Sequence, residues 1–134
     1  MLNNRGVIIN PDRARQLRDF SGLRYGLITP TDIDGFIEYH DKAHIFIELK
    51  YKNAPFPFGQ RLAYERLIND LSKTGKPTIY IIANHQIDNT SVAIDVAKAI
   101  VSEYRWKGEW HILATSITVK RFIDDFLTKV IKFP

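Results

Sequence analysis

The sequence contains no cysteine. Its absence excludes disulfide bonds and zinc sites built on cysteine thiolates. Long apolar runs are also missing, and the longest, residues 79–83, is far too short to cross a bilayer. The first residues do not have the pattern of a signal peptide. We therefore expect a soluble, cytoplasmic protein with no membrane partner.

Several motifs of common enzyme classes are absent as well. There is no phosphate-binding glycine loop and no Gly-x-Ser-x-Gly element, which disfavours nucleotide-dependent enzymes and triad hydrolases. The four histidines show no spacing typical of metal ligands. The chemistry of this chain, if it has one, must come from other residue types.

The bulk composition is that of a folded domain. The chain has 134 residues, of which 45% are hydrophobic and 25% charged, so we expect one domain over residues 1–134. The formal net charge is +4, with a pI near 9.4. This charge fits a polyanionic partner without requiring one.

The hydrophobic periodicity predicts an α/β fold, a mixed sheet with helices packed on it. Asn10 and Pro11 suit the start of a first helix, and Thr118 the cap of the last, whose core face is Phe122, Ile123, Phe126 and Val130. Residues 88–105 fit either a helix or a strand, and we favour a hairpin from about residue 97 onward. The other expected elements are strands at 24–28, 32–39, 45–50, 78–83 and 109–113 and a helix at 60–73 with the apolar face Tyr64, Leu67, Ile68 and Leu71.

The strands at 32–39 and 45–50 carry the most informative pattern. A turn centred on Asp41 would pair Ile37 with Ile45 and place Asp34 opposite Glu48. Lys50 would then share the face of both acids, because side chains on a strand alternate. Two carboxylates facing each other repel unless a cation lies between them.

This arrangement indicates metal-dependent phosphate chemistry. Hard divalent ions prefer oxygen ligands, and Asp34 and Glu48 could share one ion with the main-chain carbonyl of Leu49. The Lys50 ammonium would face the phosphate or the attacking water and stabilise developing negative charge. The alternative is a solvated sheet face on which Asp34 pairs with Lys50, a contact that contributes little to stability.

An acidic residue followed, after a hairpin, by Glu48-Leu49-Lys50 resembles the PD-(D/E)xK nuclease superfamily. Gln60 and Tyr64, four residues apart on the next helix, are similar to the Gln-x-x-x-Tyr element of its RecB-like and phage members. The order of elements follows the restriction-endonuclease-like core, αβββαβ, if residues 24–28 form a strand. The resemblance covers residues 11–84, and residues 86–134 have no assignable counterpart.

The resemblance implies a Mg²⁺- or Mn²⁺-dependent deoxyribonuclease, such as a phage endonuclease acting in a bacterial or phage-infected cell. Asp34 and Glu48 match the metal-binding acids and Lys50 the catalytic lysine. Gln60 and Tyr64 match the element that positions water or DNA. A chain without a separate sequence-reading domain is expected to cut DNA by structure or with weak sequence selectivity.

Two departures from the family pattern leave alternatives open. Pro30-Thr31-Asp32 stands where the family has Pro-Asp, so Asp32 rivals Asp34, although its register position is opposite Lys50. No glutamate precedes Glu38, so an extra acidic ligand on the first helix is missing or falls to Asp12 or Asp19. The remaining residues expected to contact DNA are Lys52, Arg61, Arg15 and Arg18, with a solvated face as the alternative for the last two.

Other functions remain compatible with the sequence. A non-catalytic nucleic-acid-binding module on the same fold fits the basic pI equally well. A subunit of a larger DNA-processing complex is a third reading, and self-association into a homodimer is left open. Phe56 and Phe58 could stack on an unpaired base, but packing against the domain is the more common use of an aromatic ring.

Overall fold

A computed structural model describes Ile8, Asp12, Gln16 and residues 19–131. The chain divides into two compact units, Met1–Thr31 and Asp32–Pro134, and the single domain expected over residues 1–134 remains a prediction. In the first unit, the prediction of a strand at 24–28 is wrong. Tyr25 and Ile28 form only an isolated antiparallel bridge, which is closed around Gly26 with a φ of 66°. Asp12 is helical, but the rest of the expected first helix lies outside the described residues.

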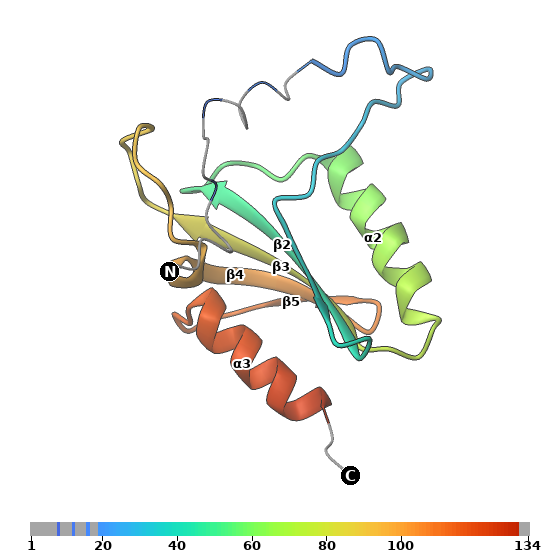
Figure 1. The fold of residues 1–134 in the computed structure, drawn as a ribbon, viewed down its shortest axis with the longest axis vertical. Helices are drawn as coiled ribbons and strands as arrows, with labels where there is room; N and C mark the ends of the chain where they lie inside the picture. Colours follow the sequence, from blue (N-terminus) through green and yellow to red (C-terminus); the bar gives the residue numbers. More distant parts are fainter. Residues whose placement is uncertain (1–7, 9–11, 13–15, 17–18, 132–134) are drawn as a thin grey trace, which may run out of the picture. The chain divides into compact units, whose positions relative to one another are not determined.

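The second unit is built on a five-stranded mixed sheet (Figure 1), so the predicted α/β class is confirmed. The strands lie in chain order. β2 and β3 are parallel and are joined through helix α2, while the other neighbours are antiparallel. Parallel neighbours require a crossover connection, and α2 provides it. The bounds are β1 Gly35–Tyr39, β2 Ala43–Tyr51, α2 Phe58–Ser72, β3 Thr78–His85, β4 Ile100–Trp106 and β5 Glu109–Ile112.

The predicted register of the first hairpin is confirmed. Ile37 pairs with Ile45 and Gly35 with Ile47, and the same spacing continued by one residue puts Asp34 opposite Glu48. The first strand, however, begins at Gly35 and not at residue 32. The ladder stops there because the Asp34 carboxylate, in place of a main-chain carbonyl, accepts the hydrogen bond of Leu49 N at 2.8 Å.

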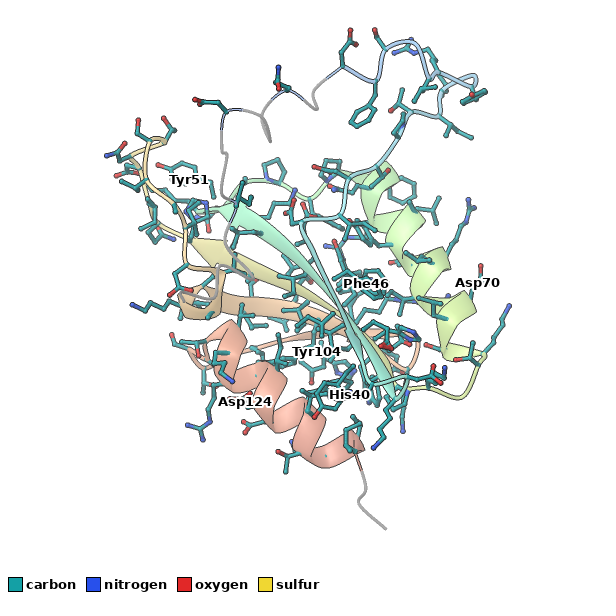
Figure 2. All side chains as sticks on the ribbon, viewed as in Figure 1. His40, Phe46, Tyr51, Asp70, Tyr104 and Asp124 are labelled. Atoms are coloured by element: carbon teal, nitrogen blue, oxygen red, sulfur yellow. The ribbon has the colours of Figure 1, made fainter. Side chains whose placement is uncertain are left out.

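The two helices of the second unit cover opposite faces of the sheet (Figure 1). On one face, Tyr64 and Ile68 of α2 pack against Phe46, Tyr80 and Ile82. Helix α3, Val119–Val130, packs against the other face through its buried side chains Val119, Ile123 and Phe126. Phe46 and Tyr104 mark the two faces in Figure 2. No helix in the described part of the chain is long and apolar enough to cross a membrane.

The remaining elements follow the expected pattern with shifted bounds. The ambiguous segment contains a short 3₁₀ helix, Val96–Lys98, and then the β4–β5 hairpin that we favoured. Thr118 caps α3 as predicted, since its hydroxyl accepts from Arg121 N at 3.2 Å. Leu67 was expected in the apolar face of α2 but is 37% exposed. Leu67 therefore lies towards solvent, and Tyr64 and Ile68 make the buried contacts between α2 and the sheet.

Candidate functional site

Strand β2 presents Glu48 on the α2 face of the sheet, at the level of the first turn of α2. The residue is only 4% exposed, although its side chain is ionisable. Glu48 Oε1 lies 3.1 Å from Lys50 Nζ and 3.4 Å from Gln60 Nε2. Its other oxygen, Oε2, is buried and has no hydrogen-bond partner among the described residues. A buried acceptor left unsatisfied destabilises the fold, so it calls for a functional explanation.

Asp34 lies beside this carboxylate, just before β1 begins. Its Oδ2 accepts from Leu49 N, which fixes the carboxylate beside β2 at the point where β1 begins. The N–H and C=O of one strand residue point to the same side of the strand. The Leu49 carbonyl therefore points to the same side of β2 as Leu49 N, which is the side on which Asp34 lies. The predicted ligand set requires this placement.

The environment of Glu48 opposes its charge. Burial raises the pKa of the Glu48 carboxyl, the Lys50 ammonium lowers it, and the negative charges of Asp34 and Asp32 raise it again. The net pKa lies above the ordinary value. The positive charge of Lys50 therefore does not offset the cost of burying the charged carboxylate beside two other acids. A further cation next to Glu48 would favour its charged form.

Lys50 is held in place by aromatic and acidic neighbours. Its ammonium lies 5.2 Å from the centre of the Phe56 ring, in addition to its ion pair with Glu48. Phe56 therefore packs against the site, which favours the packing role over a stacking role for this ring, while Phe58 is 78% exposed. The predicted placement of Lys50 on the face of the acids is confirmed, with Glu48 and not Asp34 as its ion-pair partner.

The donor set suits a hard divalent ion. Two carboxylates and a main-chain carbonyl are all oxygen donors, and Mg²⁺ often takes only one or two carboxylates and fills its shell with water and phosphate oxygens. In the part of the chain that the structure describes, no three histidine, cysteine, aspartate or glutamate side chains form a ready metal cluster. The residues present therefore fit an ion that is completed by water or substrate, and do not fit a closed structural metal site.

Helix α2 contributes Gln60 and Tyr64, as expected from their spacing. Gln60 contacts Glu48 directly. The Tyr64 hydroxyl donates to the Asp32 carbonyl, and burial followed by the Glu48 charge raises the pKa of Tyr64. Tyr64 is only 2% exposed, so it holds the segment before β1 in place and does not offer a surface to DNA.

Sequence reasoning missed Tyr80 on β3. This ring stacks on Tyr64 with centroids 4.3 Å apart, and its hydroxyl is buried without a partner among the described residues. Burial, followed by the Glu48 charge, raises the pKa of Tyr80. The site region thus contains a second orphaned polar group, and nothing in the apolar run at 78–83 could have indicated it.

The cationic residues expected to contact DNA have different surroundings. Arg61 pairs with Glu103 at 2.8 Å and stacks over Trp110 at 4.3 Å, so its charge is already compensated. Lys52 pairs with Asp88 at 3.1 Å on the surface. Arg15 and Arg18 lie outside the described residues.

Together these contacts define an α/β protein in which one sheet face, at the start of α2, carries two neighbouring carboxylates beside a lysine. Scans against protein-family models, curated proteins and solved structures found no match to this chain. Its function must therefore be argued from the site.

Proposed function

We propose that this protein is a Mg²⁺- or Mn²⁺-dependent deoxyribonuclease that hydrolyses phosphodiester bonds. The observation that carries the proposal is the buried Glu48 carboxylate, which has one oxygen without a partner and lies between Asp34 and Lys50. An arrangement that costs stability at one point is typical of a site kept for function. The mixed sheet with its β2–α2–β3 crossover supports a restriction-endonuclease-like core, which we propose as the finer fold. It departs from the order αβββαβ, because residues 24–28 form no strand and only two strands precede α2 among the described residues.

The residues divide the work as follows. Asp34, Glu48 through Oε2, and the Leu49 carbonyl would hold the ion. Such an ion supplies Lewis acidity, which neutralises charge on phosphate oxygens and makes water a better nucleophile at neutral pH. Lys50 places a positive charge beside the phosphate and stabilises the negative charge that develops on it. Gln60 donates to Glu48 Oε1, so that Oε2 would be the oxygen left to hold the ion.

The substrate proposed is DNA in the cytoplasm, cut by its structure or with weak sequence selectivity. The basic net charge of +4 favours a polyanion. Within residues 32–131, the sheet and its two helices form no second, sequence-reading unit.

A cleavage assay with Mn²⁺ on duplex, single-stranded, flap and four-way DNA tests the proposal. We expect wild-type protein to cut at least one of these, and Glu48→Ala to be inactive. Lys50→Met should lose about 10²–10³-fold in rate, the usual effect of removing a transition-state charge donor. Glu109→Ala, an exposed acid on β5, is the matched control and should cut normally. Equal inactivity of wild type and Glu48→Ala on all four substrates would overturn the proposal.

A nucleic-acid-binding module without catalysis is the second candidate. Among the described residues, no three acidic or histidine side chains form a group that could hold a metal ion, and this favours the binding module. Calorimetry separates the two functions. DNA binding that is unchanged by Mn²⁺ and by Asp34→Ala would identify the module.

A further inference from the structure

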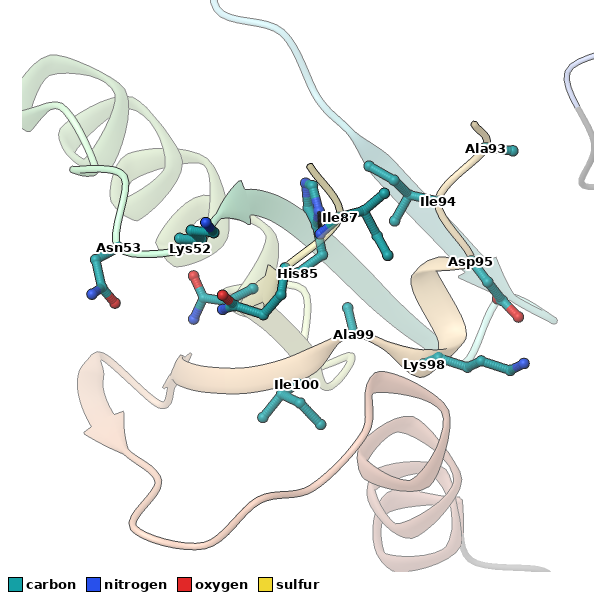
Figure 3. A pocket seen from close by; sticks show the side chains of 12 residues that line it. Lys52, Asn53, His85, Ile87, Ala93, Ile94, Asp95, Lys98, Ala99 and Ile100 are labelled. Carbon is teal, nitrogen blue, oxygen red and sulfur yellow. Dashed lines mark hydrogen bonds between the residues drawn. The ribbon is translucent and has the colours of Figure 1, made fainter. Parts of the chain in front are cut away.

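A cavity of about 570 Å³ lies at the end of strands β2 and β3 (Figure 3). Its walls come from Lys52 and Asn53 after β2, from the end of β3, and from residues 86–87 and 93–100. Ligand pockets for small molecules have volumes of roughly 300–1,000 Å³, so one nucleotide fits this space.

The cavity adjoins the candidate site along the sheet. Asn84, which lines the cavity, pairs in register with Lys50. Lys52, two residues beyond Lys50 on the same chain, lines it as well. A DNA strand with its phosphate at Lys50 would therefore have a neighbouring nucleotide at the mouth of this cavity.

The charges of the lining favour a neutral group inside. Lys52 and Lys98 are its cations, and Asp95 is its acid. Asp88, outside the lining, pairs with Lys52 at 3.1 Å, and Asp95 Oδ1 accepts from Ala97 N. With Asp88 paired to Lys52, the lining is left with one cation, Lys98, and one acid, Asp95, and their formal charges cancel. The lining therefore has no net charge to attract a phosphate. A nucleobase is neutral, and it needs apolar contacts for its faces and hydrogen-bond partners for its polar edges.

The side chains match those two needs. Three carboxamides, Asn53, Asn84 and Gln86, line the cavity, and none of their side chains is hydrogen-bonded to another described residue. Carboxamides both donate and accept, as the edges of a base do. The apolar walls come from Ile87, Ile94 and Ile100.

His85 adds a donor to this lining. Its Nδ1 accepts from Ile87 N at 3.1 Å, so the neutral ring carries its proton on Nε2. Histidine in this tautomer donates a hydrogen bond to a carbonyl or ring nitrogen of a base.

We propose that this cavity binds one unpaired nucleobase of the DNA strand that is cut, next to the scissile phosphate. The inference rests on the proposed function, and it narrows the substrate to DNA with unpaired nucleotides, such as flaps, bulges or single strands. Enzymes that take up a single base must find it unpaired or extrude it, and an unpaired base avoids that cost.

Binding without metal tests the cavity separately from cleavage. The probe is a fluorescein-labelled oligothymidylate, compared by anisotropy in EDTA with an abasic oligomer of equal length. We expect wild type to bind the base-bearing strand about tenfold more tightly, a preference equal to 1.4 kcal/mol. Ala93→Trp places a ring at an exposed cavity position and should abolish this preference. Val92→Trp, at the exposed neighbour outside the lining, should retain it.

A second variant tests the cavity independently in case Ala93→Trp does not fold. Asn53→Leu with Gln86→Leu removes two carboxamides at exposed positions and should weaken base preference without filling the cavity. Equal binding of base-bearing and abasic strands by wild type overturns the inference, as does tighter binding of the matching oligoribonucleotide.

Cleavage assays distinguish the two proposals. If Glu48-dependent cleavage occurs and Ala93→Trp and Val92→Trp cut flap DNA equally, the cavity inference fails and the nuclease proposal stands. If no substrate is cut but Ala93→Trp alone abolishes base preference, the nuclease proposal fails and the cavity remains a nucleobase site.

Discussion

At the scale of single residues, Glu48 is the point where folding stability and the proposed function conflict. Its carboxylate is buried beside two other acids, and its Oε2 is orphaned within the described residues. A residue selected only for folding at this position would be apolar, as Ile82 is at the paired position on β3. The conflict yields a prediction about the metal-free protein.

Glu48→Gln should raise the free energy of unfolding at pH 7 in the absence of metal. The pKa of Glu48 is raised in the folded protein, so the folded chain binds this proton more tightly than the unfolded chain does. Stability therefore falls as pH rises from the ordinary value of 4.5 through the raised pKa. Glutamine removes this loss, and its Oε1 can still accept from Lys50 and Gln60.

Urea unfolding between about pH 4 and pH 8 measures the effect. The curve of stability against pH should be flatter for Glu48→Gln than for wild type. Glu109→Gln, which removes an exposed acid, should follow wild type. A less stable Glu48→Gln protein at pH 7 would show that the buried charge is compensated without a metal.

At the scale of elements, the hairpin could be predicted because it depends on local pattern. Alternating side chains and a short turn fixed the pairing of Ile37 with Ile45. The start of β1 depends instead on contacts across the chain, since the Tyr64 hydroxyl holds the Asp32 carbonyl from 32 residues away. The ion pair of Arg61 with Glu103, 42 residues away, could not be predicted from the sequence pattern either.

The stacked tyrosines between α2 and the sheet allow a matched comparison. Tyr64→Phe should lower the free energy of unfolding by about 1 kcal/mol, because it removes a hydrogen bond. It should also weaken Mn²⁺ binding, since the segment carrying Asp34 loses its anchor. Tyr80→Phe keeps the same ring stack but removes a hydroxyl without a described partner, so stability should stay equal or rise. Denaturant melts and Mn²⁺ titrations of both variants provide the measurement, and equal losses of stability would contradict this reasoning.

Loss of the cap of helix α3 should lower the stability of the protein without changing metal binding or cleavage at the candidate site. Thr118→Ala removes the hydroxyl that accepts from Arg121 N and should cost about 1 kcal/mol of stability, as loss of a helix cap usually does. Mn²⁺ affinity and cleavage should not change, because α3 packs on the face opposite α2. Thr118→Ser retains the cap and serves as the control. Loss of metal affinity in Thr118→Ala would show that the two faces are coupled.

At the scale of the whole molecule, an ion that binds only the folded state stabilises the entire second unit. With Mn²⁺ at about 100 times its Kd, the free energy of unfolding should rise by about 2.7 kcal/mol. Asp34→Asn with Glu48→Gln should abolish this gain, since both carboxylates are lost. Asp124→Asn with Asp125→Asn changes the net charge by the same amount, but on α3, far along the chain from Asp34 and Glu48. This double variant should still be stabilised by Mn²⁺. Thermal melts of the three proteins, with and without Mn²⁺, separate site binding from general charge effects. Equal stabilisation of both double variants would place the ion elsewhere and remove the physical reason for the orphaned oxygen of Glu48.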